Sequence, residues 1–482
     1  MSASKYDVII VGTGFAGAFF LMRYLERAPK HVRVLVLERG GRDPKAWQLA
    51  NRRTSSLRPE EVFVNLTPEK PWLTSPGFGG NSKCWMACTT RMMPGDFELR
   101  TRYGVGEDWP MTYDDLEAHY GVVEEVMAVA GPAGSPMPRS RPYPLPPHRM
   151  ADVDRVLSAR FPEGWFSAAT ARASRATPTR RVCCASSMCE LCPVDAKFTI
   201  QNGLAHLFDD PRVTLQLDSP VDSVETAAGQ ASGVTYRHGG RPERASAELI
   251  VLAASALFNP HILLRSGIDH PLLGKRLHEQ MSVDVCLNLR GIHGYNGSTF
   301  VTGNGYLFYE GDHRRDHAAA IVETKNSPFS LGEAPLRAER GRWTERAFLR
   351  FLFDDLPRDD NQVRIHANRP DMPEVEFRGY SDYAERARKQ LPAMIDRLSE
   401  ALPIESVVNV HLDSTAAHIQ GTVVMGRDKA QSIVDRHLVH HELRNLLVLG
   451  SSAFPTASPA YPTLTVSALS LWAADHLFAA RG

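Results

Sequence analysis

Three glycines near the start of the chain follow an apolar run at a spacing that suits phosphate binding. The run Tyr6-Asp-Val-Ile-Ile-Val precedes Gly12, Gly14 and Gly17, and an amphipathic stretch follows them. Gly12 would allow a tight turn, Gly14 would let the backbone approach a pyrophosphate, and Gly17 would let a helix pack on the strand. The N–H groups at the start of that helix would face the phosphates. The spacing therefore predicts a strand–turn–helix unit that binds an adenine dinucleotide.

An acidic residue closes the second strand of this unit. Glu38 follows the run Val34-Leu-Val-Leu. A carboxylate at this place can accept hydrogen bonds from a ribose diol, and its charge opposes binding of a 2′-phosphorylated ribose. No second glycine motif of this type follows a strand, so we do not expect a separate nicotinamide domain. A flavoprotein fits the sequence better than a reductase that binds two dinucleotides.

The elements that must position these residues are spread along the chain. Runs resembling buried strands recur at Glu248-Leu-Ile-Val-Leu and at Leu446-Leu-Val-Leu, whereas alternating runs after residue 280 predict antiparallel strands. One helix is expected over Asp382 to Leu402. We therefore predict an α/β fold in which a Rossmann-type dinucleotide domain is interrupted by an α+β substrate domain built on an antiparallel sheet. The expected divisions are 1–130, 201–279 and 413–482 for the dinucleotide domain, 131–200 for a proline-rich connector with a cysteine-rich segment, and 280–412 for the substrate domain.

The composition limits which kinds of partner and which location we expect for the chain. The 482 residues contain 55 basic and 55 acidic side chains, so the formal net charge is zero, and no nucleic-acid surface is expected. Residues 445–474 carry no charge, but Pro455, Pro459 and Pro462 interrupt them, so no direct membrane span is expected. We recognise no secretion signal, so a cytoplasmic location is the default expectation. Export to the periplasm together with a partner subunit is the alternative.

Four of the seven cysteines fall within ten residues. Cys183, Cys184, Cys189 and Cys192 lie in Cys-Cys-Ala-Ser-Ser-Met-Cys-Glu-Leu-Cys, and Pro193 follows. A closing C-x-x-C-P is typical of iron–sulfur ligation, while unligated thiols and a zinc site are the alternatives. A disulfide is disfavoured because neighbouring cysteines bridge only under strain.

Three stretches of the C-terminal part form one recognisable signature: His418-Ile-Gln-Gly-Thr, Asn445-Leu-Leu-Val-Leu-Gly450 and Tyr461-Pro462-Thr463. Together they resemble the closing signature of the glucose–methanol–choline (GMC) flavoprotein oxidoreductases. The resemblance implies FAD, bound covalently or not, and oxidation of an alcohol at the flavin. The catalytic histidine of the family matches His418. Imidazole suits this role, because the hydroxyl proton needs a base while hydride leaves the carbon.

The resemblance also implies the residues around the cofactor. Tyr461 stands where the family has His or Asn, so it is expected either to assist catalysis or to reshape the pocket. Cys84 stands where some relatives bond a histidine to the flavin, so a cysteinyl link and a plain buried thiol are the two alternatives. The implied FAD-binding residues are Gly12, Gly14, Gly17, Glu38, Arg39, Gly80, Asn81, Ser82, Cys84, Val221, Gly450, Pro462 and Thr463.

Within the family, the sequence is most similar to the bacterial membrane-linked sugar and polyol dehydrogenases. That branch holds a three-iron cluster in a similar double-cysteine segment, although its last gap is one residue longer. The resemblance implies a [3Fe-4S] cluster on Cys183, Cys189 and Cys192, with Cys184 as a spare thiol. It also implies a sugar or alcohol substrate, a small accessory subunit and a quinone or cytochrome acceptor. The alternatives are a cluster-free oxidase or dehydrogenase of secondary metabolism, a lyase or isomerase that holds flavin, and a non-catalytic electron-transfer subunit, against which the His418 motif argues.

Overall fold

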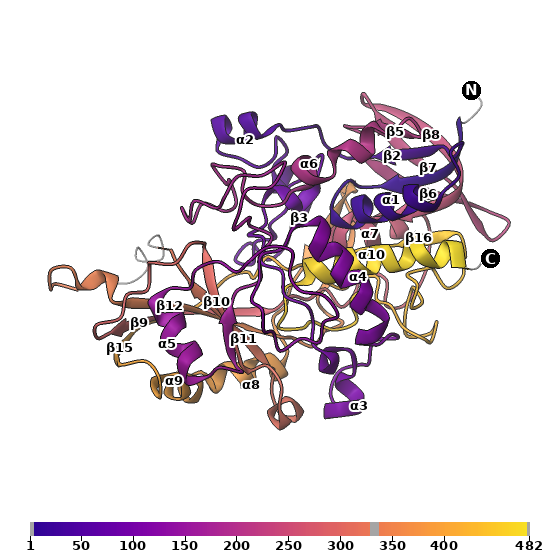
Figure 1. Ribbon diagram of the computed structural model, residues 1–482. Coiled ribbons are helices and arrows are strands. Elements are labelled where there is room, and N and C mark those ends of the chain that lie inside the picture. The colour runs from indigo at the N-terminus through magenta and orange to yellow at the C-terminus, as the bar shows by residue number, and fades with distance from the viewer. Residues whose placement is uncertain (1–3, 328–336, 480–482) are drawn as a thin grey trace.

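The computed structural model describes residues 4–327 and 337–479. Strands and helices from all parts of these ranges mix in one α/β structure, which confirms the predicted fold class (Figure 1). No helix in the described ranges is both long enough and apolar enough to cross a membrane. The helices are α1 (Phe15–Arg27), α2 (Lys45–Asn51), α3 (Leu99–Tyr103), α4 (Tyr113–Val126), α5 (Asp152–Arg160), α6 (Ile200–Gly203), α7 (Ser255–Arg265), α8 (Asp382–Lys389), α9 (Leu391–Ser399) and α10 (Pro462–Ala479).

The first sheet collects strands from three distant parts of the chain. Its order is β5-β2-β1-β8-β7-β6, with β16 paired to β8. The pairs β5–β2, β2–β1, β1–β8 and β8–β16 are parallel, whereas the pairs β8–β7 and β7–β6 are antiparallel. The bounds are β1 (Ser4–Val11), β2 (Val34–Leu37), β5 (Val213–Gln216), β6 (Val221–Ala227), β7 (Gln230–His238), β8 (Arg241–Leu252) and β16 (Leu446–Val448).

The apolar runs in the sequence become the centre of this sheet. Ile9 pairs in register with Leu35 on one side and with Ile250 on the other, and all three are fully buried. Continuous burial of this kind is expected for parallel strands that are covered on both faces. The helices α1 and α10 pack against each other beside the sheet (Figure 1). This is the Rossmann-type arrangement that the glycine motif predicted.

The second sheet is antiparallel throughout, as predicted for the substrate domain. Its order is β15-β9-β12-β11-β10-β4. Side chains alternate between its faces: Val322 and Phe351 belong to a core shared with α8 and α9, whereas Ile321 and Leu352 join the core of the first sheet. The bounds are β4 (Trp165–Ser167), β9 (Met281–Leu289), β10 (Val301–Phe308), β11 (Ala320–Lys325), β12 (Arg346–Phe353) and β15 (Ile404–Leu412), and a small third sheet joins β3 (Val64–Asn65), β13 (Gln362–His366) and β14 (Arg369–Glu376).

Two segments differ from the sequence expectation. The single helix expected over Asp382 to Leu402 is wrong, because α8 ends at Lys389 and α9 begins at Leu391. Pro392 explains the break, since it has no N–H to donate and fits only the first turn of a helix. The connector expected over 131–200 also contributes regular elements, because it contains α5, and β4 forms an edge of the second sheet.

Candidate active site

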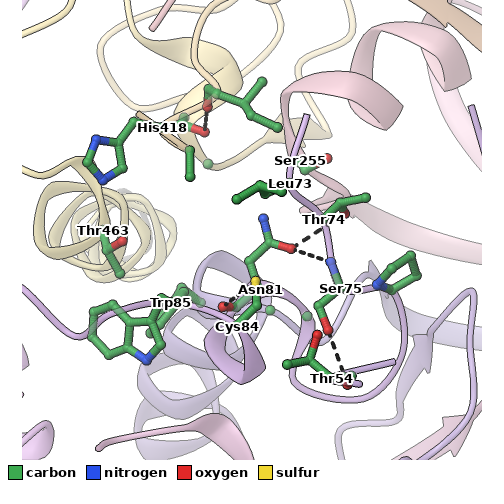
Figure 2. Close-up of a pocket in the computed structure, with 18 of the residues that line it drawn as sticks. Thr54, Leu73, Thr74, Ser75, Asn81, Cys84, Trp85, Ser255, His418 and Thr463 are labelled. Carbon is green, nitrogen blue, oxygen red and sulfur yellow. Dashed lines mark hydrogen bonds between the residues drawn. The ribbon is translucent and has the colours of Figure 1, made fainter. Parts of the chain in front are cut away.

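A cavity of about 640 Å³ lies where the two large sheets meet, and most of the predicted site residues line it. Figure 2 shows its middle portion, with Asn81 between His418 and Thr463 on one side and Ser75 and Thr54 on the other. Gly17 and Ser82 do not line it. The predicted residues that do are Gly12, Gly14, Glu38, Arg39, Gly80, Asn81, Cys84, Val221, Gly450, Pro462, Thr463, His418 and Tyr461.

The three glycines of the first motif have different environments. A Cβ atom on Gly12 would lie 2.5 Å from the carbonyl oxygen of Ala253, and one on Gly17 would lie 2.1 Å from that of Gly12. These two glycines therefore allow chain segments to pack closely. A Cβ atom on Gly14 would meet no atom within 4 Å, and Gly14 lines the cavity. It also precedes α1 without a side-chain cap, so the first amides of the helix stay available to a phosphate.

Glu38 is buried beside the glycine turn and lines the cavity. One carboxylate oxygen accepts hydrogen bonds from the backbone N–H and hydroxyl of Thr13, at 3.0 and 2.8 Å. The other accepts from the N–H groups of Gly77 and Gly40, at 3.1 and 3.3 Å. The carboxylate thus ties the first turn to the loop after Gly77, a role that the sequence did not indicate. Its contact with a ribose stays a prediction.

Arg39 lines the cavity next to Glu38. Its guanidinium lies 4.3 Å from the centre of the Phe258 ring, which also lines the cavity. Burial lowers the pKa of Arg39 to about 10, which leaves it charged at neutral pH. Val221, at the start of β6, and Gly450, after β16, also line the cavity.

The loop that contains Gly80 packs directly on the first turn. A Cβ atom on Gly80 would lie 3.1 Å from Cα of Gly14. The side-chain oxygen of Asn81 accepts from the N–H of Ser75 at 2.9 Å, which shapes the cavity wall (Figure 2). Ser82 was predicted to contact the cofactor, but it does not line the cavity. Its hydroxyl donates to the Gly79 carbonyl at 2.6 Å and accepts from the Ile200 N–H. It therefore holds the loop and is not offered to the cavity.

The thiol of Cys84 lies in the cavity wall 3.5 Å from the carbonyl oxygen of Asn81 (Figure 2). Burial raises its pKa to about 11. A thiol that stays protonated at neutral pH is a weak nucleophile. This environment favours the plain buried thiol over the cysteinyl flavin link.

His418 is held by Gln280, which immediately precedes β9. The side-chain oxygen of Gln280 hydrogen-bonds Nδ1 of His418, while its amide nitrogen donates to the carbonyls of Ser458 and Ala460 at 2.6 and 2.8 Å. These two carbonyls fix which end of the amide faces the histidine. Nδ1 therefore carries the proton, and Nε2 keeps a free lone pair. Burial lowers the pKa of His418 to about 3, with further lowering by Arg350 and Lys70.

Glu279 fixes the backbone that carries this histidine. Its fully buried carboxylate accepts from the N–H groups of Ala416 and His418 at 3.0 and 3.1 Å, and from the Thr415 hydroxyl at 3.2 Å. Lys70 pairs with the same carboxylate. Sequence reasoning missed both Glu279 and Gln280, because no motif marks them and they lie far from His418 in the chain.

Tyr461 lies beside His418, with ring centres 5.9 Å apart and planes nearly perpendicular. Its hydroxyl donates to Glu323 and accepts from the Asn304 side-chain nitrogen at 3.1 Å. Burial, reinforced by the Glu323 carboxylate, raises the pKa of Tyr461 well above its usual value. The phenol therefore keeps its proton and cannot act as a base, but it orients Glu323 toward the site.

The cysteine-rich segment lies at the side of the cavity next to Glu190. Cys189 and Cys192 are buried, Cys183 is half-buried and Cys184 is exposed. The thiol of Cys192 accepts from the Ala196 N–H at 3.2 Å, and the thiol of Cys183 contacts the Thr299 hydroxyl. Among the described residues, no three Cys, His, Asp or Glu side chains are grouped so that they could hold a metal ion. In this arrangement the thiols are not grouped to hold the predicted cluster, which stays a prediction from the sequence.

The cavity as a whole fits an extended dinucleotide with a flavin. The uncapped start of α1, the clear space at Gly14 and the carboxylate of Glu38 lie along the first sheet, while His418 and Tyr461 lie at the second. Its volume falls in the usual range for cofactor sites, about 300–1,000 Å³.

Comparison with known proteins places the chain in a family. Residues 148–282 and 357–470 match two family models that are both described as GMC oxidoreductase. The chain belongs to the GMC oxidoreductase family, and it is an oxidoreductase enzyme. This confirms the family that the sequence resembles, and FAD is the cofactor that the family implies.

Several relatives align over nearly their whole length. The fructose dehydrogenase large subunit of Gluconobacter japonicus is 24% identical over 98% of this chain and 97% of its own length. The 6'''-hydroxyparomomycin C oxidase of Streptomyces lividus is 27% identical over 99% of this chain and 92% of its own. Among solved structures, a pyridoxine 4-oxidase covers 98% of this chain and 99% of its own with a TM-score of 0.69 and 19% identity, so it shares the fold.

Proposed function

We propose that this protein oxidises a CH–OH group of a sugar, a polyol or a sugar-like molecule, with FAD as its cofactor. One observation carries the proposal: a neutral histidine with a free Nε2 lies in the same cavity as the dinucleotide-binding turn. Two relatives support the substrate class, since their names describe a fructose dehydrogenase and a 6'''-hydroxyparomomycin C oxidase.

The chain's own residues supply the proton chemistry. Nε2 of His418 would take the hydroxyl proton, while Gln280 keeps Nδ1 protonated and the ring in place. Glu279 holds the backbone of His418, so the base enters the reaction already positioned. Bound FAD would accept the hydride that leaves the carbon bearing this hydroxyl group.

The residues that would hold FAD follow from the cavity lining. The amides at the start of α1 would bind the pyrophosphate, Glu38 the ribose, and Gly80, Asn81, Cys84, Gly450, Pro462 and Thr463 would line the flavin portion. A non-covalent FAD agrees with the raised pKa of the Cys84 thiol.

The final electron acceptor would distinguish an oxidase from a dehydrogenase. Relatives include enzymes named dehydrogenases and enzymes named oxidases, so both an external acceptor and molecular oxygen are candidates. A relay through a cysteine-held [3Fe-4S] cluster, an accessory subunit and a quinone or cytochrome stays a prediction from the sequence. The proposed oxidation at the flavin does not depend on it.

Anaerobic mixing of the FAD-loaded protein with a panel of sugars, polyols and amino sugars tests the proposal. Bleaching of the flavin absorbance by at least one alcohol is expected, and its absence with every alcohol would contradict the function. Reoxidation by air or only by a dye then distinguishes oxidase from dehydrogenase.

A further inference from the structure

Two buried cations, Arg172 and Lys197, lie directly opposite each other next to the cavity. They are partners in an antiparallel bridge, and the backbone hydrogen bonds on either side place them in the non-hydrogen-bonded type of pair. In such a pair the two side chains point to the same side and come close together. Both residues are only 1% exposed. Like charges in this position are unfavourable, so the pair costs stability.

The ammonium group of Lys197 binds three backbone carbonyls from two segments of the chain. Nζ donates to the carbonyls of Lys83, Trp85 and Glu190, at 2.6, 2.9 and 2.9 Å. The first two carbonyls flank Cys84, which Figure 2 shows together with Trp85 in the cavity wall. Burial lowers the pKa of Lys197 to about 8, so the ammonium is still charged at pH 7. Its three donors are all used on carbonyl oxygens.

The guanidinium group of Arg172 binds the next part of the same wall. It donates to the carbonyls of Met86 and Val301 and to the hydroxyl of Thr299, and it lies 3.8 Å from the thiol of Cys88. Burial raises the pKa of Cys88 to about 12, so this thiol carries no charge at pH 7. In the described part of the chain, no hydrogen bond of either cation ends on a carboxylate.

The segment that these two cations bind is part of the cavity wall. Residues 84–88 all line the cavity, whereas the two cations do not, and Cys84 is among the residues that would line the flavin portion. The preceding residue, Lys83, pairs with Asp43 at 3.3 Å, and Glu190 is exposed, so water screens its carboxylate. The two cations therefore place positive charge behind the wall that the flavin would contact.

We infer that Lys197, together with Arg172, makes the bound FAD easier to reduce by placing positive charge behind this wall. When an alcohol is oxidised, its O–H proton passes to His418 and its C–H hydride to FAD, so a neutral carbonyl product forms and the flavin gains one negative charge. A buried cation stabilises such a charge more than an exposed one, because the dielectric constant around it is low. This inference rests on the proposed function, because FAD must occupy the cavity.

The reduction potential of the bound flavin tests the inference without an alcohol substrate. It is measured at pH 7 without oxygen, by equilibrating the FAD-loaded protein with redox dyes. Lys197→Met keeps the length of the side chain but removes its charge. The equilibrium between oxidised and reduced flavin should shift at least tenfold toward the oxidised form, which for a two-electron couple is a potential lower by about 30 mV. Lys197→Arg keeps the charge and should stay within threefold of the wild type.

Lys389→Met serves as the matched control, because it removes an exposed charge at the end of α8, outside the cavity, and should leave the potential unchanged. The iron content of all samples is measured and must be equal, so that a difference in potential comes from the substitution. The potential reports the ratio of the affinities for reduced and oxidised FAD. A merely structural role, which weakens both affinities equally, would therefore leave it unchanged.

The inference is overturned if Lys197→Met has the wild-type potential, or if Lys197→Arg lowers the potential as much as Lys197→Met does. Should Lys197→Met not hold FAD, Arg172→Met replaces it, with the same expected shift and the same contradicting result. If neither variant holds FAD, a wild-type potential above that of free FAD supports the inference, and one at or below it overturns the inference. Failure of the proposed function is a separate outcome, in which the dyes reduce the flavin but no alcohol does.

Discussion

The side-chain amide of Gln280 determines which nitrogen of His418 carries the proton. Two backbone carbonyls, of Ser458 and Ala460, orient the amide so that its oxygen meets Nδ1. The basic lone pair is thus left on Nε2 by a contact that involves neither substrate nor cofactor. Gln280 is a positioning residue, since it acts on the reaction only through His418.

Replacing Gln280 should affect the chemical step more than binding. In Gln280→Leu the ring loses its acceptor and its preferred tautomer, so flavin reduction should slow about 10- to 100-fold with little change in substrate affinity. Gln280→Glu restores an acceptor but adds a negative charge, which should raise the pKa of His418 and move the acid limb of the pH profile upward. Rapid-mixing measurements of flavin reduction across pH check both effects. Equal losses in both variants, with no shift of the profile, would argue for a merely structural role.

Removing the base itself should have a larger effect. His418→Ala is expected to bind FAD normally but to reduce it about 10²- to 10⁴-fold more slowly, which is the usual range for loss of a general base. The flavin spectrum verifies that the cofactor is bound, and stopped-flow absorbance gives the rate. Bleaching at the wild-type rate would remove His418 from the mechanism.

The buried histidines should make the protein sensitive to acid. For His418 the folded-state pKa of about 3 lies below the unfolded value near 6.5, so the unfolded state binds more protons between these values. Stability should therefore fall as the pH drops from 6.5 toward 4. Asp354 and Asp355, whose pKa values burial raises to about 6 and 7, oppose this trend in part. Five other histidines, whose pKa values burial lowers to about 4, reinforce it: His148, His261, His278, His437 and His440.

Denaturant midpoints at pH 7 and pH 5 measure this balance. A lower midpoint at pH 5 is expected, and an unchanged or higher midpoint would show that the carboxyl groups dominate. The catalytic rate should behave differently over the same range, because His418 stays neutral well below pH 5 and its protonation contributes no acid limb near pH 6.5.

Substitutions at Gly14 and Gly17 should change different properties: the affinity for FAD at Gly14, and the stability of the fold at Gly17. Gly14→Ala places its Cβ atom in open space within the cavity, so the protein should fold with near-normal stability but bind FAD at least tenfold more weakly. Gly17→Ala forces a Cβ atom against the Gly12 carbonyl and should cost about 3 kcal/mol or more of stability. Thermal unfolding and fluorescence titration with FAD make the comparison. Comparable FAD affinity in Gly14→Ala and wild type would place the pyrophosphate elsewhere.

Two simple assays address the thiols. Acid precipitation of the wild type should release all the flavin into the supernatant, because the Cys84 thiol stays protonated. Flavin in the pellet that disappears in Cys84→Ala would show a covalent link instead.

Iron and acid-labile sulfide analysis of anaerobically purified protein tests whether the cluster predicted from the sequence is present. About three irons per chain that are lost in Cys189→Ala would establish it, and a flavin spectrum without iron would exclude it.

Much of the cofactor half could be predicted from the sequence because its signals are local. The spacing of Gly12, Gly14 and Gly17 encodes the turn, and the continuous apolar runs around Ile9 and Ile250 encode buried parallel strands. The closing motif indicated His418 for the same reason, since the residues that define it are neighbours in the chain.

The residues around the substrate end of the cavity could not be predicted, because their proximity depends on how distant strands pair. Glu323 and Arg350 become neighbours only when β11 and β12 pair, and nothing local to either residue encodes that pairing. Likewise, Gln280 and His418 are 138 residues apart in the chain and meet across two loops. The role of Tyr461 also depends on a contact that is distant in the chain, because its hydroxyl partner, Glu323, comes from β11.

The placement of β16 in the first sheet has a consequence for how the protein is made. This strand and α10 come from the last forty residues, yet β16 pairs with β8 and α10 packs on α1. During synthesis the earlier strands of the sheet therefore stay partly unpaired until β16 and α10 have been made. A chain that stops before Leu446 lacks both this strand and this helix even if it contains His418, so such incomplete products should have neither a finished flavin site nor its reactivity.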